Sequence, residues 1–91
     1  MTDEELEQAL QELQESLDKL PDSDSLTKPE RRRRYVLLLK KETLLRIKEA
    51  REKNNKHDEF TNIANYGVLT AYGDKHPILM RLARAKFGIN L

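Results

Sequence analysis

The chain has 91 residues, of which 17 are Lys or Arg and 16 are Asp or Glu, so the net charge is +1 at neutral pH. Hydrophobic residues make up 37% and charged residues 36%, against about 45–50% and about 25% in ordinary globular domains, which excludes one thick core at this length. Cysteine is absent, which excludes a disulfide framework and thiolate zinc sites. No apolar run suits a signal peptide or a membrane span, so we expect an intracellular, cytoplasmic protein without membrane contacts.

Charge is unevenly distributed along the chain. Residues 1–24 carry nine acidic residues and one basic residue, a net charge of −8. Residues 25–56 carry twelve basic and four acidic residues, a net charge of +8. Such a chain can neutralise itself by folding its first segment onto its second, or it can present the two segments to different partners. The sequence leaves both alternatives open.

An acidic first helix is expected over residues 1–20. Thr2 and Glu5 have the spacing of a capping box, and Pro21 ends the helix. Its leucines recur at spacings of 4, 3, 4 and 3 residues, which is typical of a narrow coiled-coil seam. The predicted interaction seam consists of Leu6, Leu10, Leu13, Leu17 and Leu20. So narrow a stripe needs a facing stripe, from its own chain or from a second copy.

A linker over residues 21–29 and a basic helix over residues 28–55 are expected next. The linker is rich in turn-forming residues and can reverse the chain. Thr27 and Glu30 repeat the capping-box spacing, with Pro29 in the first turn, and the helix is expected to end near Asn54. Because its apolar residues point to nearly opposite sides, its middle must be covered from more than one direction.

Residues 57–91 are expected to form a helical hairpin. Its first helix is expected to begin at Asp58 and to end at Gly73. Small and apolar residues with helical spacing form its predicted buried face, namely Phe60, Ile63, Ala64, Gly67, Val68, Ala71 and Tyr72. Gly67 indicates either a close helix crossing or a kink.

The last helix is expected to begin at Pro77. Its predicted buried side consists of Ile78, Leu79, Leu82, Ala83 and Phe87. Four of the five aromatic residues lie in the last 35 residues, so this hairpin is expected to be the nucleus of the fold.

The most distinctive local feature is a run of four arginines at the start of the basic helix. Consecutive helical residues point in different directions, so no single acidic stripe can pair with all four. The predicted contacts to phosphate or to an acidic partner are Arg31, Arg32, Arg33, Arg34, Lys40 and Lys41. The alternative interpretation is a solvated helix start, partly neutralised by the acidic first helix.

No pattern points to catalysis, a cofactor, a metal or a small-molecule substrate. His57 and His76 lack the spacing of zinc ligands, and helix capping accounts for the neighbouring Asp58 and Asp74. A Gly-rich phosphate loop and a nucleophile elbow are both missing from a sequence with three glycines.

These patterns predict an all-α fold of about four helices in one domain. A long antiparallel, coiled-coil-like hairpin is expected to precede a shorter helical hairpin. The predicted function is that of a small, non-catalytic protein-interaction or regulatory adaptor that acts through helix packing, as a homodimer or with another helical protein. The alternative is a nucleic-acid-associated protein that uses the basic cluster at residues 31–34.

Overall fold

The computed structural model describes residues 1–21 and 23–87, including all side chains in these ranges except those of Ser23, Asp74, Leu79, Ala83 and Phe87. Over these residues the fold is all-α, which confirms the predicted class and the four helices. The elements are α1 (Asp3–Asp18), the 3₁₀ turn η1 (Ser23–Ser25), α2 (Lys28–Glu52), α3 (Lys56–Tyr72), the 3₁₀ turn η2 (Gly73–Lys75) and α4 (Pro77–Phe87). None of the described helices combines the length and apolar character needed to cross a membrane.

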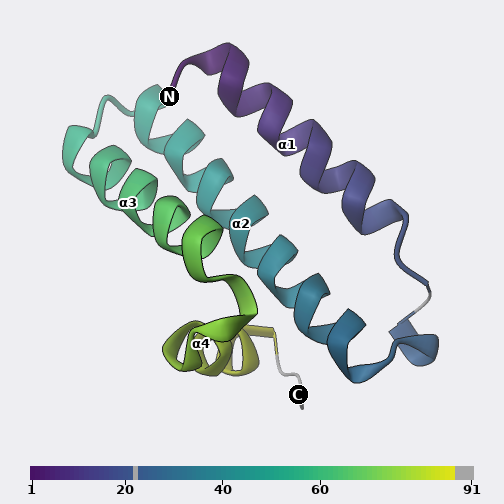
Figure 1. Ribbon diagram of the computed structural model, residues 1–91. Helices are drawn as coiled ribbons and strands as arrows, with labels where there is room; N and C mark the ends of the chain where they lie inside the picture. The colour runs from purple at the N-terminus through teal and green to yellow at the C-terminus, as the bar shows by residue number, and fades with distance from the viewer. Residues whose placement is uncertain (22, 88–91) are drawn as a thin grey trace.

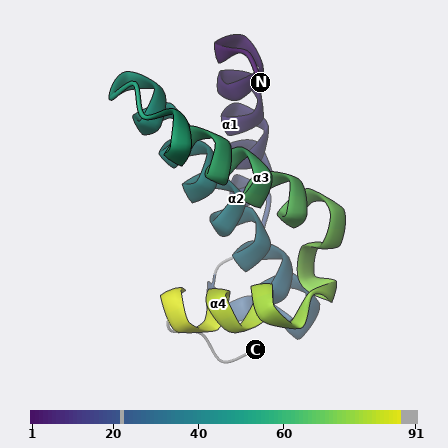
Figure 2. The same ribbon diagram turned by 90° about the vertical axis from the view of Figure 1, so that its left-hand side faces the viewer.

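Helix α2 is the central element of the fold. It pairs with α1 in the predicted antiparallel hairpin, and α3 runs along its other side (Figure 1). Helix α4 crosses the amino-terminal half of α2, at the end of the molecule away from the turn between α2 and α3 (Figures 1 and 2). Helices α3 and α4 each contact α2 more than they contact one another. The two-sided coverage expected for α2 is therefore provided by three helices.

Capping boxes begin the first two long helices, as predicted. The Thr2 Oγ1 accepts a hydrogen bond from the Glu5 N–H at 3.1 Å, and Thr27 Oγ1 accepts one from the Glu30 N–H at 3.4 Å. In return, each glutamate carboxylate accepts the backbone N–H of its threonine. Hydrogen bonds from Thr2 and Thr27 lower the pKa of Glu5 and of Glu30 below the ordinary value, because they favour the charged carboxylate.

The residues predicted to end the helices do so, although several helix boundaries differ from the predicted ones. Helix α1 ends at Asp18 instead of Leu20, in a tightened last turn. Asn54 adopts a left-handed φ of 53° just after α2, and Gly73 adopts a φ of 54° just after α3. Both conformations end a helix, as the sequence predicts.

The predicted start of α3 at Asp58 is wrong. The helix begins two residues earlier, because the Asn55 side chain provides the cap and accepts the Asp58 N–H at 3.2 Å. The Asp58 side chain also accepts a hydrogen bond from the Asn55 amide. Asp58 therefore lies in the first turn, where its negative charge is favourable to the helix dipole.

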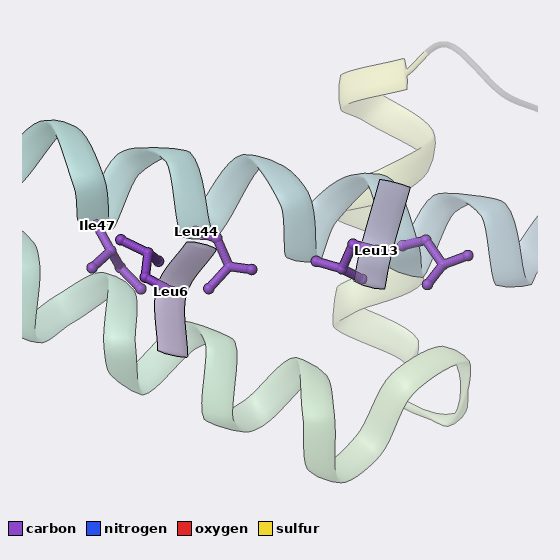
Figure 3. Packing of buried hydrophobic residues seen from close by; sticks show 5 residues of the cluster. Leu6, Leu13, Leu44 and Ile47 are labelled. Carbon is purple, nitrogen blue, oxygen red and sulfur yellow. The ribbon is translucent and has the colours of Figure 1, made fainter. Parts of the chain in front are cut away.

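The hydrophobic core lies between α1 and α2. Leu6 packs against Leu44 and Ile47 (Figure 3), and these two α2 side chains have 0% exposed surface. Leu13 packs further along the same helix pair. Two α3 side chains, Ile63 and Tyr66, are partly buried against this cluster. The expectation that residues 57–91 contain the nucleus of the fold is therefore wrong.

The predicted buried face of α3 is also wrong, apart from Ile63. Helix α3 turns a different side toward α2, on which Leu69 is buried and Ile63 and Tyr66 are half-buried. Burial of Leu69, Ile63 and Tyr66 on this side stabilises the orientation, since it removes apolar area from water. The other members of the predicted face are exposed, and they are Phe60, Ala64, Gly67, Val68, Ala71 and Tyr72.

The predicted buried side of α4 is contradicted where the structure describes it. Ile78 and Leu82 are both more than half exposed, because α4 contacts α2 over a short crossing instead of packing along α3. The side chains of Leu79, Ala83 and Phe87, which complete the predicted side, lie outside the described residues.

We predict that Leu44→Ala lowers the free energy of unfolding by about 2–5 kcal/mol, since it removes a fully buried side chain from the core. Leu45→Ala is the matched control, because Leu45 is the next residue of the same helix and is 46% exposed. Its expected cost is about 1 kcal/mol or less. Chemical denaturation measures both values, and equal losses would contradict the position of the core.

Candidate interaction surfaces

The leucine seam of α1 packs inside its own chain. Leu6 and Leu13 are buried against α2. The remaining members of the predicted seam, Leu10, Leu17 and Leu20, are partly buried against the same core. The facing stripe that the seam requires is therefore provided by α2, and little of the seam is left for a second copy.

Charged contacts between α1 and α2 follow one antiparallel register. Asp3 pairs with Arg51 at 2.8 Å, and Glu7 pairs with Lys48 at 3.0 Å. Further along, the Lys41 ammonium donates a hydrogen bond to the Gln14 side chain at 2.6 Å. The hydrogen bond and the charge of Glu7 raise the pKa of Lys48 above its ordinary value. The acidic segment thus folds onto the basic one, as one of the two alternatives proposed.

Arg51 joins three parts of the chain. Its Nε donates to Glu59 of α3 at 2.9 Å, while its Nη1 donates to Asp3 of α1. A third donor, Nη2, bonds to the Met1 carbonyl oxygen. Hydrogen bonds to Glu59 and to Asp3 raise the pKa of Arg51 above its ordinary value. One guanidinium therefore fixes the amino-terminal end of α1 and the first turn of α3 on the end of α2, a role that the sequence analysis missed.

The four arginines lie outside this network. Arg32 and Arg33 are exposed, whereas Arg31 and Arg34 are half-buried. Within residues 1–21 and 23–87, no ion pair involves any of the four, and the buried Nε of Arg31 has no hydrogen-bond partner. The predicted companions Lys40 and Lys41 are half-buried, and Lys41 is bound to Gln14. The structure therefore leaves Arg32 and Arg33 directed to solvent.

Arg31 and Arg34 lie near the buried Tyr35. Burial raises the pKa of the Tyr35 hydroxyl, and the positive charges of Arg31 and Arg34 oppose that increase. Long arginine stems can cover apolar surface while their charged ends reach water. Arg31 and Arg34 are therefore partly packed against the fold and only partly available to the basic surface.

Helix α4 adds positive charge to the same end of the molecule. Residues 75–86 contain four basic residues, Lys75, Arg81, Arg84 and Lys86, and no acidic residue. Lys86 is paired with Glu42 of α2. Because α4 crosses the amino-terminal half of α2 (Figure 1), segments far apart in sequence make this end of the molecule basic.

The outer face of α3 is apolar, uncharged and uncovered. Residues 60–73 contain no charged side chain, although 36% of the whole chain is charged. Phe60 is 75% exposed, Tyr72 is 55% exposed and Val68 is 38% exposed. In the view from the side of α3, no described segment lies in front of this helix (Figure 2). The missing charge was the sequence signal that could have identified this surface.

A shallow groove connects this face to α4. Val68 and Leu69 of α3, Leu82 and Ala85 of α4, and Leu39 and Thr43 of α2 line a hollow of about 440 Å³. Glu42, Arg46 and Lys86 border it. Val68 of α3 and Leu82 of α4 are therefore exposed apolar side chains that share one groove.

The histidines show no arrangement suited to a metal. The residues that the structure describes contain no group of three or more His, Asp or Glu side chains that could hold a metal ion. The Nδ1 of His76 accepts the Ile78 N–H at 3.2 Å, at the start of α4, and its ring meets the Tyr72 ring edge-on at 5.4 Å. His76 is therefore accounted for by capping and packing. The side chain of Asp74, the other predicted cap, is outside the described residues.

No protein-family model, no curated protein and no solved structure matches this chain.

We predict that Arg51→Gln lowers the free energy of unfolding by roughly 1 kcal/mol or slightly more, because partly exposed ion pairs contribute about 0–1 kcal/mol each and Arg51 makes two. Lys53→Gln is the matched control, since Lys53 lies at the same end of α2 and its ion pair is with Glu49 of that helix. We expect the control to melt like wild type. Thermal unfolding at low salt measures the difference, and a wild-type melting curve for Arg51→Gln would show that Arg51 does not join the helices.

Proposed function

We propose that this chain is a small, non-catalytic protein that acts by packing against helices of other protein molecules. The supporting observation is the apolar surface formed by α3 and α4, in a chain with few apolar residues to spare. Its large exposed side chains are Phe60, Val68, Tyr72, Ile78 and Leu82.

The size of this surface supports an interaction role. From their exposed fractions, the five side chains leave on the order of 500 Å² open to water, given that a whole aromatic side chain buries about 150–250 Å². Val68 and Leu82 line one groove, and exposed apolar surface of this extent commonly marks a binding site. Exposed helices that carry alternating charges are solvated, whereas residues 60–73 have none.

This proposal moves the interaction surface away from α1. The leucine seam was the expected contact, but its side chains are used within the chain. A partner helix is a suitable occupant for the groove, because helix-in-groove recognition places apolar side chains between helices and charged ones at the rim. Glu42, Arg46 and Lys86 provide such a rim.

If the chain has an interaction role, the tagged wild-type chain should capture other proteins, which can include an untagged copy of itself. Placing charge on the apolar surface should abolish this capture. The test variant carries Phe60→Lys and Leu82→Lys, at two exposed sites. Its control carries Gln8→Lys and Gln11→Lys on the outer face of α1, also exposed, and so gains the same charge. Circular dichroism checks that both remain helical. Equal capture by the two variants would contradict the proposal.

The second candidate function is association with nucleic acid. It is favoured by Arg32 and Arg33, which are exposed without ion pairs in the described part of the chain, at the same end of the molecule as the basic helix α4. The two ion pairs between α1 and α2 lie near the other end of α2, so neither uses Arg32 or Arg33, whose charges remain available to phosphates.

This candidate predicts binding of duplex DNA that weakens with salt. Replacing Arg32, Arg33, Arg81 and Arg84 by Gln should lower the affinity for all sequences and reduce the log–log salt slope by about one unit for each lost phosphate contact. Lys53→Gln with Lys56→Gln is the control, since both lysines are exposed at the other end of α2. Fluorescence anisotropy at several salt concentrations measures both. Equal effects of the two variants would contradict a basic binding surface at this end.

A further inference from the structure

The groove between α3 and α4 has an apolar floor. Helix α2 contributes Leu39 and Thr43 to it, and α3 contributes the buried Leu69. The Thr43 hydroxyl donates a hydrogen bond to the Leu39 carbonyl oxygen at 2.8 Å, so it needs no polar partner from outside. Val68 and Leu82 line the same groove and are 38% and 55% exposed. Apolar side chains are therefore the suitable occupants of its centre, because a polar group buried there would lose its hydrogen bonds to water.

At the rim of the groove, two cations share one carboxylate. Arg46 Nη2 lies 2.9 Å from Glu42 Oε1, and the Lys86 ammonium pairs with the same oxygen atom. Within residues 1–21 and 23–87, neither cation forms another ion pair. The Arg46 side chain is 56% exposed and that of Lys86 is 36% exposed. Because a guanidinium has five N–H donors and an ammonium has three, both cations keep donors for a second carboxylate.

The two sides of the groove contribute positive charge only. Residues 60–73 on the α3 side contain no charged residue, and residues 75–86 on the α4 side contain four basic residues and no acidic one. Glu49 and Asp58 border the adjacent hollow that Arg46 also lines, and Glu49 is paired there with Lys53. The excess of positive charge therefore lies toward α4, and opposite charges across an interface are favoured over like charges.

Helix α1 shows which kind of occupant combines these features. It places its leucine stripe on apolar side chains of α2, and two flanking carboxylates, those of Asp3 and Glu7, pair with Arg51 and Lys48. The groove presents the same combination on another side of α2, an apolar lining with cations at the rim. Helix-in-groove recognition uses such a stripe, with apolar anchors at i, i+3 or i+4, and i+7.

We propose that this groove binds an amphipathic helix of a partner protein, with an apolar stripe flanked by Asp or Glu residues. The stripe packs between Val68 and Leu82, and a flanking carboxylate accepts hydrogen bonds from Arg46 and Lys86. This inference rests on the proposed function, since it gives the chemistry of the partner that the interaction surface binds.

Two synthetic helical peptides test the sign of the partner's charge. Both carry leucines at i, i+4, i+7 and i+11, and the flanking positions are Glu in one peptide and Lys in the other. Fluorescence anisotropy of the labelled peptides measures their affinity for the full chain at low salt. We expect the Glu peptide to bind about ten-fold more tightly than the Lys peptide or better. Equal affinities, or tighter binding of the Lys peptide, would overturn the inference.

Replacing Arg46 and Lys86 together by Gln tests the rim. The double variant should bind the Glu peptide about ten-fold more weakly, since each exposed ion pair contributes a factor of up to about five. Its affinity for the Lys peptide should rise, which loss of the fold would not produce. Arg32→Gln with Arg33→Gln is the matched control, because it removes the same charge from exposed arginines outside the groove. An equal loss in the control would indicate general attraction between charges and would overturn the inference.

Glu42→Gln should act in the opposite direction. It removes the acidic residue that lines the groove, so the Glu peptide should bind several-fold more tightly and the Lys peptide more weakly. A gain in affinity for one peptide cannot arise from damage to the fold. Weaker binding of the Glu peptide to this variant would overturn the role assigned to the rim.

Leu82→Ser separates this inference from the proposed function. Since Leu82 is an exposed apolar residue of the groove, the substitution should weaken both peptides. If it does so but the two peptides bind equally to wild type, the interaction role stands and the acidic partner is wrong. Duplex DNA that binds in place of the peptides and is lost with the Arg46 and Lys86 variant would assign the rim to phosphates and overturn the inference. Absence of both peptide binding and selective capture would overturn the two proposals together.

Discussion

The burial of the middle of α2 is the constraint on which the rest of the structure depends. This helix has apolar side chains on several sides, and Leu44 and Ile47 are fully buried only because α1 and α3 both contribute to the same core. Helix α1 has a stripe too narrow to persist alone, so its leucines and those of α2 need each other. Helix α3 places Ile63, Tyr66 and Leu69 on the remaining side of α2, which fixes the face that it leaves outside.

The antiparallel register of the first hairpin determines which basic residues are neutralised. The pairs Asp3–Arg51 and Glu7–Lys48 and the contact between Gln14 and Lys41 all join residues whose numbers sum to 54 or 55. In the same register, residues 31–34 lie opposite residues beyond the end of α1 at Asp18. The opposite net charges of the two segments, −8 and +8, are evident from the sequence. Which basic residues are paired is not evident, because a net charge gives no information about the register of two helices.

Local features of the fold were predictable because they depend on residues close together in the chain. Threonine–glutamate capping boxes, Asn54, Gly73 and Pro77 act on the backbone next to them, and the structure confirms each of these signals. The orientation of α3 was not predictable in this way. Two stripes with helical spacing overlap on this helix, and the contact with α2, through Leu69, Tyr66 and the Arg51–Glu59 pair, selects between them. Ala64, Gly67 and Ala71 share the helical spacing of Phe60 and Tyr72, so spacing alone favours the other stripe.

The outward-facing stripe of α3 still has regular helical spacing. Such spacing indicates that a helix face is suited to packing, but it does not identify what packs on that face. In α3, Ile63, Tyr66 and Leu69 face α2 and bury apolar area. Ala64, Gly67 and Ala71 face outward together with the larger Phe60 and Tyr72. A chain that is only 37% hydrophobic exposes Phe60, Val68 and Tyr72 at the expense of its own core. Exposure of this kind is unfavourable for an isolated molecule, and contact with another protein molecule removes that cost. The chain has few apolar residues, which is why α2 depends on α1 for its burial. The same shortage supports the proposed contact between this chain and another protein molecule.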